Sequence, residues 1–137
     1  MKRIDFQQLS EMRLNEAKAL LDAGFPEGAY YLAGYAIECA LKACIAKRTI
    51  RHEFPERDPH KYYKHDLAEL LAHARLRSDF DIDLQTNPEL KGSWIRLQNW
   101  SEEARYEQGK TVKEARDLIE AIEDGKGGTL PWLQQRW

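Results

Sequence analysis

The stretch GAYYLAGYAIECALKACIA, residues 28–46, is the most apolar part of the 137-residue chain. Its apolar side chains recur at steps of three and four, which predicts a helix from Pro26 to about residue 50. Because this helix is apolar almost all round, we expect it to lie at the centre of the fold. Glu38 and Lys42 interrupt the stretch and make it a poor membrane span.

Capping signals predict where other helices begin and end. Asp5, Asp66 and Thr111 each stand three residues before a glutamate or glutamine, which is the spacing of a capping box. Asn87 precedes a proline, the pattern of a cap followed by a first helical turn. Gly24 is a natural helix stop, so the first helix is expected to end just before it.

Two segments carry no helical pattern. Residues 51–65 contain two prolines and are expected to form a long loop, of the kind that is often functional. In residues 79–86, Phe80, Ile82 and Leu84 alternate with aspartates. This segment is therefore expected to be extended or irregular, with those three side chains pointing inward.

The helices and their short links predict an all-α fold. Five helical segments without a hairpin signal are typical of an up-and-down antiparallel helical bundle of four to five helices. The length fits a single helical domain over residues 1–137. Its core is expected at about residues 5–124, followed by a short apolar tail at residues 125–137.

Charge and cysteine content exclude several classes of protein. With 21 Lys and Arg against 23 Asp and Glu, the chain has a net charge of −2, which disfavours a general nucleic-acid coat but still allows a local basic patch. Two cysteines, Cys39 and Cys44, exclude a disulfide scaffold and favour a reducing compartment. Residues 1–8 are too polar for a signal peptide, so we expect the protein in the cytoplasm.

The sequence lacks the common metal and nucleotide motifs. It has no Gly-rich phosphate loop, no Cys-x-x-Cys pair and no His-Glu-x-x-His helix. Asp79, Asp81 and Asp83 have the first spacings of a calcium loop, but Leu84 stands where that loop needs glycine. The histidines match no compact zinc-ligand pattern. We therefore expect no metal and no other cofactor.

A polar stripe runs along the apolar helix and has two interpretations. Tyr31, Tyr35, Glu38 and Lys42 follow one another at steps of three or four and share one face. In the commoner interpretation, Glu38 and Lys42 form a salt bridge and Lys42 extends to the surface. In the other, the stripe lines a polar cleft where the tyrosines stack a nucleobase and the lysine holds a phosphate.

Two further segments combine cationic and aromatic side chains. Residues 61–67, KYYKHDL, are either a surface for single-stranded nucleic acid or an ordered loop with packing tyrosines. Arg105, followed by Tyr106, comes just after a predicted helix end. Its guanidinium can hold a phosphate or carboxylate, or it can pair with a nearby glutamate such as Glu102 and order the turn.

Three stretches together resemble the HEPN domain. They are GFPEGAYYLAGYAIECALKA at residues 24–43, His65-Asp66-Leu67 at the start of a helix, and Trp100 followed by Arg105-Tyr106. The resemblance implies a helical bundle that usually dimerises and acts on RNA or nucleotides in the cytoplasm. It also implies a frequent nucleotidyltransferase partner, in a toxin–antitoxin or defence pair.

Many members of this family are metal-independent ribonucleases, whose motif is Arg, four to six residues, then His. Here that spacing is absent: only three residues separate Arg48 from His52, and the last histidine, His73, comes before Arg105. The catalytic pair of the family therefore has no counterpart by sequence. A ribonuclease would need His65 as general base and Arg105 to stabilise the pentavalent phosphate.

Three interpretations follow. The first is a non-catalytic module that binds a nucleotide, RNA or a nucleotidyltransferase partner. The second is a divergent ribonuclease with catalytic Arg105 and His65. The third is a purely structural protein. The ligand-binding candidates are Tyr31, Tyr35, Glu38, Lys42, His65, Asp66, Arg105 and Tyr106. A homodimer is expected because the central helix has more apolar faces than a small bundle buries, and because the tail adds Trp132 and Trp137.

Overall fold

The computed structural model describes residues 1–48 and 65–137, and every regular element in these ranges is a helix. The α-helices are α1 (Arg3–Asp22), α2 (Pro26–Arg48), α3 (Leu67–His73), α4 (Arg77–Thr86), α5 (Pro88–Gln98), α6 (Val112–Glu123) and α7 (Thr129–Gln134). A short 3-10 helix, η2 (Glu102–Tyr106), precedes α6. The predicted all-α class is confirmed. Seven α-helices in the described ranges exceed the four to five expected.

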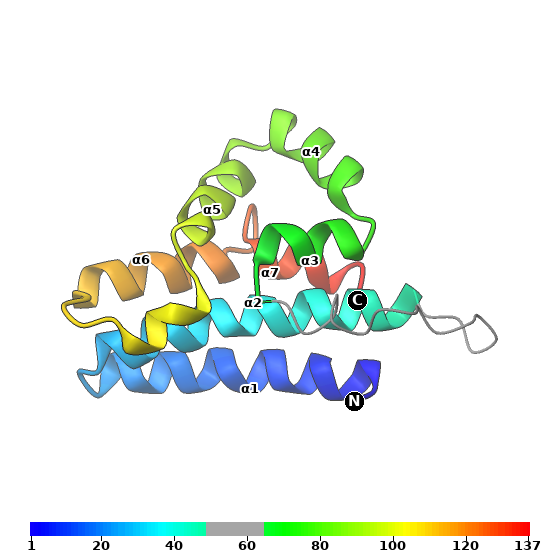
Figure 1. Ribbon diagram of the computed structural model, residues 1–137. Coiled ribbons are helices and arrows are strands. Elements are labelled where there is room, and N and C mark those ends of the chain that lie inside the picture. Colours follow the sequence, from blue (N-terminus) through cyan, green and yellow to red (C-terminus); the bar gives the residue numbers. More distant parts are fainter. Residues whose placement is uncertain (49–64) are drawn as a thin grey trace.

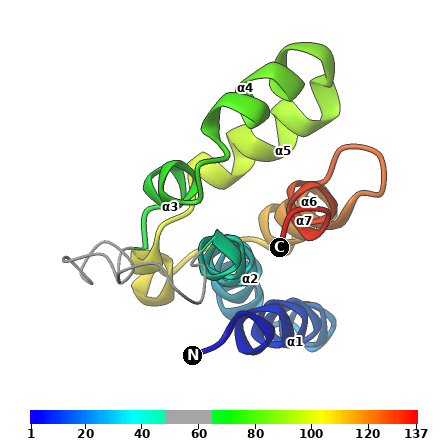
Figure 2. The same cartoon turned by 90° about the vertical axis from the view of Figure 1, so that its right-hand side faces the viewer.

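The apolar helix α2 lies at the centre, as predicted. α1 runs back along it, and α3, α6, α7 and η2 cover its other sides (Figures 1 and 2). Ile37 and Leu41, near its middle, are completely buried. Residues 49–64, which hold the end of the predicted second helix and most of the predicted loop, lie outside the described residues. No helix in the two described ranges is both long and apolar enough to cross a membrane.

A left-handed glycine turns the chain from α1 into α2. Gly24 has φ +88° and follows the last turn of α1, which confirms the predicted stop. Its N–H donates to the Leu21 carbonyl at 3.2 Å, and the Phe25 N–H donates to the Leu20 carbonyl at 2.9 Å. These two bonds satisfy carbonyls at the helix end that would otherwise lack partners.

Three of the four predicted caps are confirmed. The side chains of Asp66, Asn87 and Thr111 each accept a hydrogen bond from the backbone N–H three residues on, at 3.0–3.1 Å. The prediction for Asp5 was wrong. Asp5 lies inside the first turn of α1, where its carboxylate accepts from the Lys2 N–H at 2.7 Å, so Lys2 is the capping position.

The segment expected to be extended or irregular is instead the helix α4, so that prediction was wrong. Phe80 and Leu84 stand one helical turn apart and pack against the core, whereas Ile82 is 62% exposed. Phe80 meets the rings of Trp94 and Trp132 edge-on, at centroid distances of 5.0 and 4.8 Å. The spacing of Phe80 and Leu84 fits one face of a helix as well as it fits a strand. The rings that Phe80 contacts come from α5 and α7.

The apolar tail is part of the packed interior. Trp132 and Leu133 of α7 are buried, and the indole N–H of Trp132 donates to Asp83 Oδ2 at 2.8 Å. Trp137 packs half-buried against the same core. The apolar faces of α2 and the tail tryptophans, on which the expected homodimer was based, are thus largely covered within one protomer. The homodimer stays a prediction.

A close approach between α2 and the segment before η2 depends on one glycine. The indole of Trp100 lies directly over Gly34, and a Cβ added to Gly34 would overlap that ring. Trp100 is 5% exposed, and its N–H donates to the Tyr31 carbonyl at 3.2 Å. The ring is therefore held from two sides and has little room to move away.

We expect Gly34→Ala to destabilise the protein by about 3 kcal/mol, because it overpacks a closed part of the core. Gly92→Ala is the matched control, since Gly92 is also helical and a Cβ there meets nothing within 4 Å. That change should stabilise the protein by roughly 0.5–1 kcal/mol through helix propensity. Urea denaturation measures both, and similar effects of the two variants would contradict the prediction.

Candidate functional site

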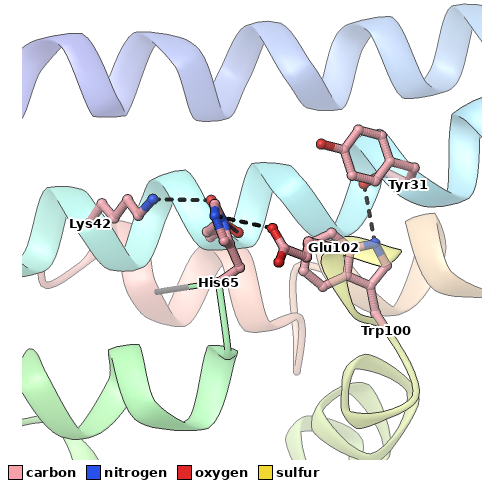
Figure 3. A network of polar contacts seen from close by, with 6 residues as sticks. Tyr31, Lys42, His65, Trp100 and Glu102 are labelled. Carbon is pink, nitrogen blue, oxygen red and sulfur yellow. Dashed lines mark hydrogen bonds and ion pairs between the residues drawn. The ribbon is translucent and has the colours of Figure 1, made fainter. Parts of the chain in front are cut away.

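A buried carboxylate lies at the middle of α2. Glu38 is 1% exposed, yet both its oxygens have partners. Oε2 accepts from the Nζ of Lys42 at 3.1 Å, one turn further along the helix. Oε1 lies 3.0 Å from Nδ1 of His65, which comes from the chain just before α3 (Figure 3). The salt bridge predicted from the sequence is confirmed, and His65 joins it.

His65 connects this pair to η2. Its second ring nitrogen, Nε2, lies 3.1 Å from Oε2 of Glu102, so each nitrogen faces a carboxylate (Figure 3). An imidazolium can donate to both carboxylates, whereas a neutral imidazole can donate to only one. The next residue, Asp66, is exposed and caps α3. The polar network of Glu38, Lys42, His65 and Glu102 thus links α2, the start of α3 and η2.

An aromatic row continues the network along α2. The ring of Tyr31 stacks near-parallel with those of Tyr35 and Trp100, at centroid distances of 6.0 and 6.1 Å. Burial raises the pKa of the Tyr35 phenol. The stripe predicted from the sequence therefore exists, but its tyrosines stack on each other and on a tryptophan of the same chain.

Arg105 and Tyr106 lie at the exposed end of η2. The guanidinium of Arg105 stands 4.8 Å from the centre of the Tyr106 ring, and Tyr106 is 73% exposed. The Tyr106 phenol, and after it that of Tyr31, raise the pKa of Arg105. Arg105 comes one 3-10 turn after Glu102 and so shares its side of η2. No hydrogen bond or ion pair joins Arg105 to His65 in the described part of the chain.

A pocket of about 570 Å³ opens beside His65, between the start of α3, the end of α5 and η2. Trp94, Leu97 and Trp100 form its apolar wall. The carboxylates along it belong to Asp66, Glu69, Glu102 and Glu103, and no lysine or arginine of residues 1–48 and 65–137 lines it. We call this the acidic pocket. It suits a flat apolar group that carries hydrogen-bond donors.

Most of this pocket could not be predicted from the sequence. Trp94 recurs with helical period, which is typical of core packing, and Glu103 is one of several glutamates that could pair with Arg105. Trp94 from α5 and Glu103 from η2 face one pocket because the chain turns between the two helices. Adjacent acidic residues after a tryptophan were the available signal, and they do not indicate a pocket by themselves.

Two predictions about ligands remain untested by the structure. Residues 61–64 of the basic and aromatic segment lie outside the described residues, as do His52 and His60. Within residues 1–48 and 65–137, no group of three His, Cys, Asp or Glu side chains is placed to hold a metal ion. The predicted absence of a metal or cofactor therefore stays a prediction.

Both cysteines are poor nucleophiles in the folded protein. Cys39 and Cys44 are free thiols on α2 and are 2% exposed. Burial raises the pKa of each thiol from about 9 to about 11. Neither is a reactive thiolate at neutral pH, so a cysteine-based reaction is disfavoured.

We expect Lys42→Met to lower the free energy of unfolding by about 2 kcal/mol, since it leaves the buried Glu38 carboxylate with His65 alone. Lys91→Met, at an exposed position of α5, is the matched control and should change stability by less than about 0.5 kcal/mol. Chemical denaturation at neutral pH compares the two variants. Equal losses would show that Lys42 does not stabilise the buried charge.

The polar network and the acidic pocket use the three stretches that resemble the HEPN domain. The family model of the HEPN domain matches residues 7–124, which cover the helices from α1 to α6. No curated protein matches the chain, and no solved structure matches it. With a match over most of its length, the chain belongs to the HEPN domain family.

Proposed function

We propose that this HEPN domain is a non-catalytic binding module that takes a nucleobase in the acidic pocket. Members of the family are generally nucleotide-binding or ribonuclease-like. The observation that carries the proposal is the composition of the pocket: two tryptophans lie in the wall, and the exposed carboxylate of Glu103 lies beside them. A nucleobase offers a flat apolar ring together with N–H donors, and so it matches both features.

The charge of the pocket selects which part of a nucleotide enters. The exocyclic amino groups of cytosine and adenine donate hydrogen bonds, and a carboxylate accepts them. Uracil presents a carbonyl oxygen at the position where cytosine has its amino group, so it lacks that donor. The phosphate of a nucleotide or of single-stranded RNA is expected to stay outside, because carboxylates outnumber the one histidine among the described residues that line the pocket.

The geometry of His65 favours binding over cleavage. A general base needs a ring nitrogen free to take a proton from the substrate hydroxyl. Both nitrogens of His65 face carboxylates, of Glu38 and Glu102, at 3.0 and 3.1 Å. Arg105 is associated with Tyr106 and Tyr31 rather than with His65.

The test is to titrate the protein with cytidine and, separately, with uridine. Tryptophan fluorescence reports binding, since Trp94 and Trp100 line the pocket. We expect cytidine to bind at least about fivefold more tightly than uridine, because one matched donor is worth about 1 kcal/mol or more. Glu103→Gln should remove most of this preference and leaves the contacts of His65 intact.

Glu11→Gln is the matched control, since Glu11 is an exposed carboxylate on α1, away from the pocket. It should retain the preference for cytidine. If cytidine and uridine bind equally, or if Glu103→Gln binds both as the unchanged protein does, the acidic pocket does not take the base.

The ribonuclease is the second candidate, because His65 contacts η2 through Glu102 and Arg105 lies one turn further on the same side. RNA incubated with the protein and EDTA separates the two functions. The binding module leaves the RNA intact. Cleavage that Arg105→Ala and His65→Ala both lose, while both still fold, would replace the proposal with the ribonuclease.

The expected homodimer, a nucleotidyltransferase partner, a role in a toxin–antitoxin or defence pair, and a cytoplasmic location are also proposals. Family membership supports the first three, and two buried free thiols are compatible with a reducing compartment. For the homodimer, we expect light scattering to give twice the mass of 16.0 kDa at working concentrations. A mass of one chain would contradict it.

A further inference from the structure

A second pocket, of about 460 Å³, lies where the C-terminal ends of α2, α3 and α7 meet. Its cationic side chains are Lys47, Arg48, Arg75 and Arg136, and no aspartate or glutamate of residues 1–48 and 65–137 lines it. We call it the basic pocket. The acidic pocket lies at the start of α3 and the basic pocket at its end, so the two pockets of opposite charge share one short helix.

The cations of the basic pocket have few carboxylate partners among the described residues. In residues 1–48 and 65–137, Lys47, Arg48 and Arg75 form no ion pair. Arg136 has one long contact, 3.5 Å from Asp83 Oδ2. Like charges gathered in one pocket repel one another, and a bound anion removes that repulsion.

Arg136 is held rigidly in place. Its guanidinium lies over the Trp132 ring at 3.6 Å, and its Nη1 donates to the Trp132 carbonyl at 2.8 Å. A planar guanidinium that is already oriented loses little freedom when it binds an oxyanion through two parallel hydrogen bonds. The rest of the wall is formed by Cys44, whose thiol contacts the Leu133 carbonyl, and by the buried side chain of Leu76.

The backbone at Arg75 is in a conformation that is uncommon for a residue with a side chain. Arg75 has φ +58°, and no other non-glycine residue in the described ranges has a positive φ. It ends α3 in the way that Gly24 ends α1: its N–H donates to the Ala72 carbonyl at 2.9 Å, and the next N–H donates to the Leu71 carbonyl at 3.2 Å. Glycine fits this position without strain. A strained residue that lines a pocket is typical of a functional site.

We propose that the basic pocket binds the di- or triphosphate group of a small ligand. Four cations exceed the charge of a single phosphate, which is at most −2, and match tandem phosphates better. The pocket volume is in the range of small-molecule sites. The site shares no lining residue with the acidic pocket, so this inference does not depend on the proposed function.

Calorimetric titration with inorganic pyrophosphate and tripolyphosphate, at constant ionic strength, tests the proposal. We expect saturable binding of one anion per chain, at least about tenfold tighter than the binding of orthophosphate. Arg75→Gly removes one cation and suits the backbone at that position, so the variant is expected to fold. Its affinity for pyrophosphate should fall at least about tenfold.

Two controls make the test specific. Arg116→Gln removes an exposed cation of α6 outside the pocket and should leave the affinity unchanged. Glu103→Gln changes the acidic pocket alone and should also leave it unchanged, whereas Arg75→Gly should retain any preference for cytidine over uridine. Failure of one site is therefore distinguishable from failure of the other.

Adenosine triphosphate and a short RNA distinguish the sources of the phosphate. Binding of adenosine triphosphate that depends on Arg75 supports a small ligand with tandem phosphates. Binding of RNA that depends on Arg75, without binding of pyrophosphate, would overturn the proposal in favour of a nucleic-acid backbone. So would the absence of saturable pyrophosphate binding, or an equal loss of affinity in Arg75→Gly and Arg116→Gln.

Discussion

The carboxylate of Glu38 is buried in the middle of the central helix, and a buried charge is costly unless it is paired and hydrogen-bonded. Lys42 supplies one partner from the same helix, and His65 supplies the other from the chain before α3. Through its second nitrogen His65 also reaches Glu102 of η2. These contacts hold the start of α3 and η2 against α2, and the acidic pocket lies between α3, η2 and the end of α5.

The interior around α2 is built for close approach. Gly34 leaves space for the Trp100 indole, whose N–H donates to the Tyr31 carbonyl. This contact carries the chain from the end of α5 across α2 and positions η2 beside His65. The packing at Gly34 and the charge pairing at Glu38 thus both hold the segment from Trp100 to η2 against α2. The stacked rings of Tyr31 and Tyr35 lie on the same face of α2.

The short helix α3 separates two pockets of opposite charge. Its first residues line the acidic pocket, and the residues just after its end line the basic pocket. The net charge of −2 conceals this division, since it averages over the whole surface. In salt solution, a charge acts on a ligand mainly within a Debye length of about 10 Å. A ligand in either pocket therefore responds mainly to the charges that line that pocket.

The sequence by itself determined the all-α class, the central place of α2, the stop at Gly24 and the caps of α3, α5 and α6, because helical periodicity and capping are local properties. It also determined the pairing of Glu38 with Lys42, which stand one turn apart. The tertiary structure alone decided that residues 79–86 form α4, since the buried partners of Phe80 come from α5 and α7. Only the tertiary structure places His65 beside Glu38, and only the tertiary structure forms each pocket from three or more segments. Such contacts depend on how helices far apart in sequence pack together.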